Sequence, residues 1–301
     1  MEDWMSSLSY SSKIKPFSQL YLPGSDNACS FNVNESDEVG MDLSKCLRSL
    51  ASIPLGKETL GRWMKHQYVH LETQLLLGIR YLHIKLSSRD GQFFALNGLY
   101  CGLIKDHMHA IHRFLMEHKK EIVILHFTHF SNFTSSDFQS FEKLIEQHFD
   151  DLLLRKEEDI NNPFNDLSID DIWKKNNQII CVVDEPFESS SSFIWNEGIT
   201  KIEPKYESIE KTCKEFEDII KESEDNENKG LIIFTGVVSL SLFNALQKPY
   251  GRYEKEYGRT TTRSLTDWIK KSASNLRPFV LSTHFIDEGK FCQSIIDLNF
   301  Y

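Results

Sequence analysis

Several polar side chains that could exchange protons or hold an anion follow or interrupt short apolar runs of this chain. They are Asp26, Asn27, His83, Lys85, Asn97, Asp184 and His284. Imidazole and carboxylate groups work as general bases and acids when their pKa lies near the working pH. A lysine adds a compact positive charge that can bind a phosphate group. The residue types and their positions therefore indicate proton transfer beside an anionic group.

Asp26 and His83 allow two interpretations. In the first, Asp26 and Asn27 only cap the backbone of a turn after a strand, as Asx side chains often do. In the second, His83 faces Asp26 and the two form a His–Asp couple in which His83 is the base. Alone, an aspartate with an ordinary pKa of about 3.9 is a far weaker base than an imidazole.

Short apolar runs bounded by Gly, Pro or polar clusters predict the strands that must position these residues. We expect strands at Gln19–Leu22, Tyr81–Leu86, Phe93–Leu96, Ile122–Thr128, Gln178–Asp184, Leu231–Thr235 and Pro278–Phe285, and a weaker one around Ser192–Trp195. Several runs are almost continuously apolar, which is typical of strands buried on both faces.

Apolar residues at helical spacing predict helices between these strands. The expected helices are Glu58–Leu77, Leu103–His118, Ser135–Phe149, Thr262–Ser274 and Glu288–Leu298, and Ser135 or Ser136 is the expected cap of the third. The polar stretches Arg155–Ser168 and Glu222–Gly230 are interpreted as loops. About eight alternating units favour one barrel domain over residues 1–301, with helices outside and the chemistry at the carboxyl ends of the strands.

Composition narrows the classes of function. The chain has 301 residues, and its 34 basic and 44 acidic residues give a net charge of −10, which disfavours nucleic-acid binding. Six cysteines without CxxC spacing predict no zinc knuckle. No apolar run of about 18 residues predicts a transmembrane segment, and the N-terminus does not resemble a signal peptide. We therefore expect a cytoplasmic location, with no metal and no cofactor.

Three segments resemble the strand-end motifs of the catalytic X domain of phosphatidylinositol-specific phospholipase C. They are Leu22–Ala28, Gly78–Lys85 and Phe93–Gly98. Small family members that contain only an X domain are the nearest likeness, and the resemblance covers nearly the whole chain. It implies an α/β fold, a TIM-type barrel of the phospholipase C kind that is possibly not fully closed.

The same resemblance assigns roles to individual positions. Asp26 stands where the family has the histidine that acts as general base, and Asn97 stands where it has the histidine that acts as general acid. His83 replaces an acidic residue, Lys85 replaces the arginine that stabilises the transition state, and His284 stands where an acid is common. An amide cannot shuttle a proton as an imidazole does.

These replacements lead to three hypotheses about function. The first is an X-domain protein with little or no phosphodiesterase activity that binds a phospholipid headgroup or a protein partner, through Asn27, Lys85, Asp184 and His284. The second is an active, metal-independent phosphoric diester hydrolase that uses His83, Lys85 or His284 in relocated roles. The third is an interaction scaffold.

Two further groups of residues have an ordinary and a functional interpretation. The segment Lys248–Arg263 mixes cations with tyrosines and could touch phosphoinositides or an anionic membrane surface, although a solvated loop explains it equally. His66 and His70 are four residues apart on the expected helix Glu58–Leu77, a spacing that zinc sites use. No third ligand supports zinc, so we interpret them as surface or packing histidines.

Overall fold

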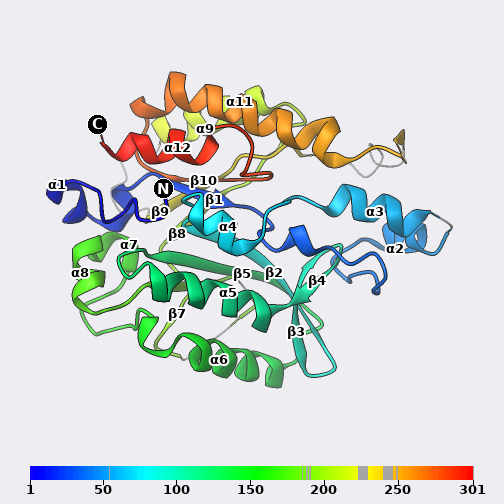
Figure 1. Cartoon of the computed structure of the whole chain (residues 1–301), viewed down its shortest axis with the longest axis horizontal. Helices are drawn as coiled ribbons and strands as arrows, with labels where there is room; N and C mark the ends of the chain where they lie inside the picture. Colours follow the sequence, from blue (N-terminus) through cyan, green and yellow to red (C-terminus); the bar gives the residue numbers. More distant parts are fainter. Residues whose placement is uncertain are drawn as a thin grey trace.

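Eight parallel strands form an open, curled half-barrel in the computed structural model (Figure 1). The structure describes residues 1–300 except 54, 185, 188, 190, 223–229, 240–246 and 249. The strands are β1 (Leu22–Ser25), β2 (Tyr81–Arg89), β5 (Val123–Ser131), β6 (Ile179–Val183), β7 (Ile194–Trp195), β8 (Ile199–Ile202), β9 (Leu231–Thr235) and β10 (Val280–Thr283). Their order is β7-β6-β5-β2-β1-β10-β9-β8.

The half-barrel is open between β7 and β8, which lie at the two ends of the strand order and form no ladder among the described residues. Only residues 196–198 separate these two short strands. The first pairs with β6 and the second with β9, so one short stretch of chain forms both edge strands of the sheet. The expected phospholipase-C-like α/β fold is confirmed, in its incompletely closed form.

The expected strand Phe93–Leu96 is not a parallel strand of the barrel. It lies in β3 (Gln92–Asn97), which pairs antiparallel with β2 and then with β4 (Leu99–Leu103). Asp90 and Gly91 both have positive φ and turn the chain back after β2. A turn this short permits only an antiparallel return.

Two helices replace the single helix expected at Glu58–Leu77. They are α3 (Gly56–Met64) and α4 (Leu71–Leu76), and an irregular segment of six residues separates them. Gln67 lies in this segment and is buried. Its amide nitrogen donates to the carbonyls of Asp26 and Thr283, each at 3.0 Å. These bonds tie the segment to the carboxyl ends of β1 and β10, where a continuous helix could not reach.

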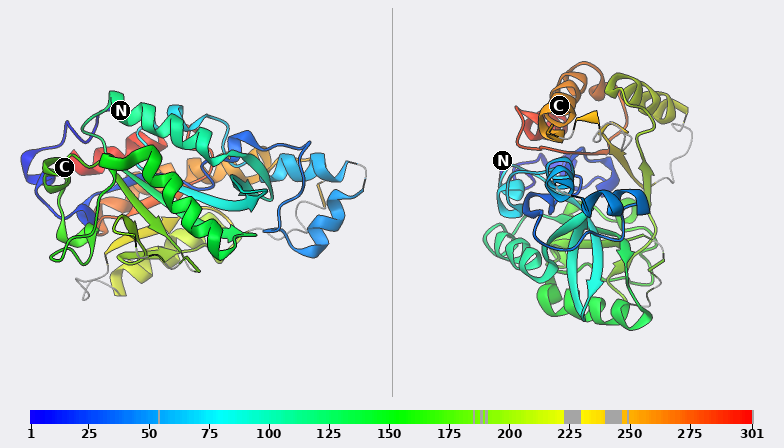
Figure 2. Two further views of the ribbon diagram at one scale, coloured as in Figure 1. Left: turned by 90° about the horizontal axis from the view of Figure 1, so that it is seen from below. Right: turned by 90° about the vertical axis from the view of Figure 1, so that its right-hand side faces the viewer.

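The other helices lie around the sheet, and most expected ones are confirmed with shifted ends. They are α1 (Tyr10–Lys13), α2 (Lys45–Ala51), α5 (Ile104–Glu117), α6 (Ser135–Phe149), α7 (Pro163–Asp166), α8 (Ile169–Lys174), α9 (Ile209–Glu222), α11 (Arg259–Ser272) and α12 (Phe291–Ile296). The expected loop at 155–168 therefore contains a short helix, and most of the one at 222–230 lies outside the described residues. The views in Figures 1 and 2 show α2 and α3 projecting from one end of the molecule.

Strand residues alternate between two apolar cores. Leu22, Ile124 and Val182 belong to the inner one, whereas Leu82 and Leu125 pack outward under the helices. Side chains two positions apart share a face, so the inner series on each strand continues to its carboxyl end. There the apolar residues give way to polar ones.

The Pro-Gly-Ser sequence of the first motif lies within β1, and its glycine has a packing reason. A Cβ atom on Gly24 would lie 2.9 Å from the Tyr81 ring and 3.1 Å from the backbone of Ser282. Glycine thus lets β1 sit close to both of its neighbours, β2 and β10, directly beneath the polar layer.

Candidate functional site

Asp26 lies at the centre of the polar layer, held by side chains from three segments. His83 on β2 donates from Nδ1 to Oδ1 of Asp26 at 2.6 Å, and His284 after β10 donates from Nε2 to Oδ2 at 2.8 Å. The amide of Asn27 adds a third bond at 2.7 Å. The exposed fractions of Asp26, His83 and His284 are only 6%, 3% and 5%. Of the two interpretations that the sequence leaves open, the structure has the contact between His83 and Asp26 that the second one requires.

Charge in the pair of Asp26 and His83 resides on the carboxylate and not on the imidazole. Burial opposes ionisation of the carboxyl, but its contacts with His83 and His284 outweigh burial and hold the pKa of Asp26 well below its usual range. Burial lowers the pKa of His83 to about 3 despite the neighbouring carboxylate. We conclude that an ionised Asp26 accepts a hydrogen bond from a neutral His83 near pH 7.

His83 does not present its second nitrogen to an open pocket. Its Nε2 accepts from the hydroxyl of Thr128 on β5 at 2.9 Å. The couple of His83 and Asp26 is therefore assembled, but the nitrogen that would act as a base is engaged. A hydroxyl of a ligand would first have to displace Thr128.

His66 is a site residue that the sequence reading assigned to a helix surface. It lies in the irregular segment between α3 and α4, and its ring stacks on that of His284 with centroids 3.9 Å apart. Its Nε2 faces the carbonyl of Trp63 at 3.2 Å, so Nδ1 is the acceptor for the amides of Asn27 and Asn97, each at 3.1 Å. Burial lowers the pKa of His66 well below its usual value, so it stays neutral.

Asn97 occupies the end of β3, as the motif predicted, and its amide is fully used. It donates to the carbonyl of Met64 at 2.6 Å as well as to His66. Asn97 therefore links the β3 end to the segment between α3 and α4. The amide has no titratable proton for a leaving group.

Lys85 and Asp184 lie at the rim of the same layer. Lys85 is half-buried on β2, and no carboxylate among the described residues forms an ion pair with it. Asp184, after β6, instead pairs with Nε2 of His126 at 2.7 Å. His126 in turn binds the hydroxyl of Tyr81 at 2.6 Å through Nδ1. Asp184 thus belongs to a second, adjacent pair and does not contact Asp26.

Part of the tyrosine-rich segment 248–263 lies against the site rather than in solvent. Tyr253 is buried, and its hydroxyl donates to Nδ1 of His284 at 2.8 Å. Its ring packs near Trp63, with centroids 6.5 Å apart. Tyr250 in the same segment is 79% exposed. The interpretation as a solvated loop therefore fits Tyr250 but not Tyr253.

Metal binding finds no support in the described part of the chain, where no three His, Cys, Asp or Glu side chains could share a metal ion. His70 is the exposed N-cap residue of α4, so His66 and His70 lie in the irregular segment and not on one helix face. All six cysteines are described and are free thiols. No described helix is both long and apolar enough to span a bilayer.

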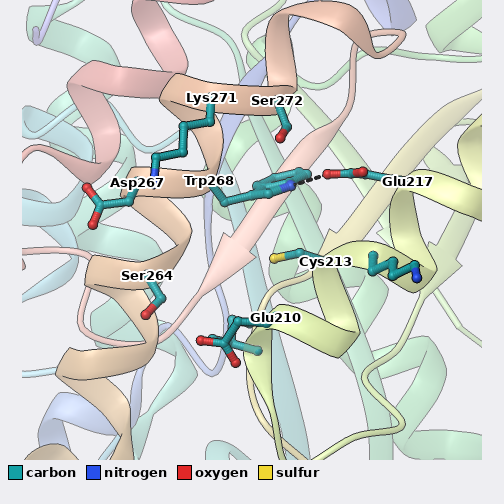
Figure 3. Close-up of a pocket in the computed structure, with 10 residues that line it drawn as sticks. Glu210, Cys213, Glu217, Ser264, Asp267, Trp268, Lys271 and Ser272 are labelled. Atoms are coloured by element: carbon teal, nitrogen blue, oxygen red, sulfur yellow. Dashed lines mark hydrogen bonds between the residues drawn. The ribbon is translucent and has the colours of Figure 1, made fainter.

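A surface cavity of about 350 Å³ lies elsewhere, between α9 and α11 (Figure 3). Trp268 forms part of its wall and donates from Nε1 to Glu217 at 2.7 Å. Its thiol, Cys213, is buried, which raises the pKa of that group to about 12 and leaves it unreactive. None of the candidate site residues lines this cavity, so it is separate from the polar layer.

Comparisons with known proteins agree with this arrangement. A family model described as PI-PLC X matches residues 59–299. The human PI-PLC X domain-containing protein 2 is 30% identical over 203 residues, covering 64% of this chain and 63% of that protein. The mouse protein of the same name is 25% identical over 309 residues, covering 99% of this chain and 87% of that protein.

Solved structures share the fold. The phosphatidylinositol-specific phospholipase C from Listeria monocytogenes superposes with a TM-score of 0.70 at 17% identity, covering 100% of this chain and 99% of that one. One from Staphylococcus aureus gives 0.68 at 15% identity, covering 100% and 98%. Because the family match spans most of the chain and includes β2 with its motif, this chain belongs to the PI-PLC X family.

Proposed function

We propose that this PI-PLC X protein cleaves phosphatidylinositol poorly or not at all, and that its barrel mouth binds a phospholipid headgroup. One observation carries the first half. The two positions to which the resemblance assigns base and acid hold Asp26, whose carboxylate accepts from three side chains, and Asn97, whose amide donates to a carbonyl and an imidazole. Loss of one positioned base alone costs roughly 10²- to 10⁴-fold in rate.

Headgroup binding is supported by groups that still lack partners. Lys85 is a half-buried cation without an ion pair among the described residues. The side-chain amide oxygen of Asn27 is buried and accepts no hydrogen bond from the described residues. A phosphate on Lys85 and a polyol hydroxyl on Asn27 would satisfy both groups.

The rim of the mouth supports a membrane surface as the source of that headgroup. Met41, Ile53 and Leu55 beside α2 and α3 are about half exposed, and Tyr250 is 79% exposed. These elements project from one end of the molecule (Figure 1). Apolar and aromatic side chains at such a rim favour the interfacial region of a bilayer.

The test of catalysis is release of inositol phosphate from phosphatidylinositol vesicles. Wild-type protein should release no more than Asp26→Asn, which keeps the side-chain size but removes the charge. A combined Asp26→His, His83→Asp, Lys85→Arg and Asn97→His variant restores the family pattern and is expected to exceed both. Wild-type release well above the level of Asp26→Asn would contradict the proposal.

The relocated hydrolase is the second candidate, because His83 and His284 both contact Asp26. It predicts wild-type activity that His83→Gln or His284→Gln abolishes, whereas Lys105→Met, at an exposed position of α5, leaves it intact. The scaffold hypothesis predicts neither cleavage nor vesicle binding. One set of proteins therefore separates all three functions.

A further inference from the structure

A continuous chain of hydrogen bonds leads from Asp26 to the protein surface. His83 bridges Asp26, at 2.6 Å, and the hydroxyl of Thr128, at 2.9 Å. The same hydroxyl lies 2.9 Å from Nδ1 of His129. His129 is exposed, whereas Asp26, His83 and Thr128 are buried. Three contacts thus join the buried carboxylate to solvent.

The direction of these bonds follows from what each atom can donate. His83 uses its Nδ1 hydrogen on Asp26, so its Nε2 must accept from the Thr128 hydroxyl. The oxygen of Thr128 then accepts from Nδ1 of His129. Every bond points toward Asp26, the arrangement that a stepwise proton transfer inward requires.

A β-bulge in β5 brings the side chain of His129 close to Thr128. Lys85 on β2 is paired with Thr128, but Ser87 is paired with Ser131, so β5 carries an extra residue there. His129 adopts a positive φ of 71° in this bulge. A left-handed conformation is costly for a residue other than glycine and is found most often at functional sites.

We propose that Thr128 and His129 form a proton path between the buried Asp26–His83 pair and solvent. A proton from water binds Nε2 of His129, the Nδ1 hydrogen of His129 passes to Thr128, and the Thr128 hydrogen passes to Nε2 of His83. The products are a neutral His129, an intact hydroxyl and an imidazolium beside Asp26. No other reactant is needed, and the steps reverse when the proton leaves.

Other charged groups around His83 do not provide a second path of this kind. The ring of His126 lies with its centroid 5.7 Å from that of His83, and both its nitrogens are engaged by Tyr81 and Asp184. Lys201 on β8 acts on His83 only through its charge and pairs with Glu203 at 2.6 Å. In the described part of the chain, the contacts through Thr128 join His83 to the exposed side chain of His129 by consecutive hydrogen bonds.

This inference goes beyond the proposed function, because it holds whether or not a phosphodiester is cleaved. It gives a buried imidazole a way to change its charge. An anionic group beside Lys85 would favour the imidazolium form of His83, and the path would supply the required proton through His129 and Thr128.

The experiment measures how fast His83 gains and loses a proton at Nε2, by ¹⁵N relaxation dispersion of that nitrogen on the whole protein at mildly acidic pH without added ligand. Thr128→Val should slow exchange by about an order of magnitude, since it removes one hydrogen bond of a buried chain. Thr128→Ser keeps the hydroxyl and should restore the wild-type rate. His129→Gln should also slow exchange, and His109→Gln on α5 should not.

The outcome that overturns the proposal is an unchanged exchange rate in both Thr128→Val and His129→Gln, with the His83 resonance at its wild-type position. That position reports an intact bond to Asp26 and therefore a folded site. Vesicle cleavage plays no part in this readout, so failure of the proton path and failure of the proposed function remain distinguishable.

Discussion

At the scale of single residues, acidic and imidazole side chains have changed places in the candidate site relative to the family resemblance, and they still contact each other. A carboxylate stands where the family resemblance places an imidazole, and imidazoles stand at two positions where it places acids. Asp26 still contacts both His83 and His284. The interaction between the side chains is thus retained, but the proton-accepting nitrogen is no longer at the Asp26 position, and even a 1 Å displacement is costly in catalysis.

The buried neutral state of His83 makes a prediction about pH. Its pKa falls from the usual 6.5 to about 3 on folding, so the unfolded chain binds more protons between these values. Stability that is present near pH 7 is therefore lost as the pH falls from about 6.5 toward 3, on the order of 1 kcal/mol per pH unit from this group. Denaturant unfolding of wild type and His83→Asn at pH 7, 6, 5 and 4 measures it.

The His83→Asn protein should show the smaller decline over that range. Other buried histidines, including His66, also contribute to the wild-type slope, and the difference between the two proteins isolates His83. Asp26 acts at lower pH: its depressed pKa means that its contribution is present above about 3.9 and is lost as the pH falls further. Parallel curves for the two proteins would contradict the assignment of a neutral His83.

At the scale of elements, helix ends follow local hydrogen bonding that apolar periodicity does not report. The sequence reading expected Ser135 or Ser136 as the cap of α6. The structure instead uses Thr134, which accepts from the backbone of Asp137, while the Asp137 carboxylate binds the backbone of Thr134. This reciprocal capping box satisfies two donors at once.

Replacing the cap should reveal which residue is responsible. Thr134→Ala is expected to lower the free energy of unfolding by about 1 kcal/mol. Ser135→Ala, one position along the same helix, should change it little. Chemical denaturation of the two variants beside wild type gives the comparison. An equal loss of unfolding free energy in both variants would contradict the assignment of Thr134 as the cap.

At the scale of the whole molecule, the open half-barrel places its polar layer beneath a projecting rim. Lys85 lies within the layer, and the exposed apolar residues of the rim stand beside α2 and α3. Wild-type protein is therefore expected to sediment with phosphatidylinositol vesicles and less with phosphatidylcholine vesicles. Lys85→Met should weaken this binding roughly five- to tenfold, as loss of one charge-assisted bond would, and should do so most at low salt.

Lys105→Met is the matched control, because Lys105 is an exposed lysine on α5. It should bind the two kinds of vesicle as wild type does. Equal sedimentation of wild type with both lipids would contradict recognition of the headgroup. Loss of binding in the control would mean that the net charge of the protein, and not Lys85 itself, determines vesicle binding.

The sequence by itself determined the type of fold and much of the site. Apolar runs bounded by turn residues locate β2, β5, β6, β9 and β10 within a few residues, because burial on both faces leaves a local pattern. The motifs singled out Asp26, His83 and Asn97, and the contact between the first two, one of two interpretations that the sequence left open, is present in the structure. These features follow from neighbours in the sequence.

Only the tertiary structure decided which further residues enter the site. His66 and Tyr253 reach it because Gln67 interrupts the expected helix and because a distant segment packs on His284. Whether an imidazole is neutral and which nitrogen is engaged also depend on burial and on partners such as Thr128. Periodicity records which face of an element is buried, but contacts between segments far apart in the chain leave no local pattern to read.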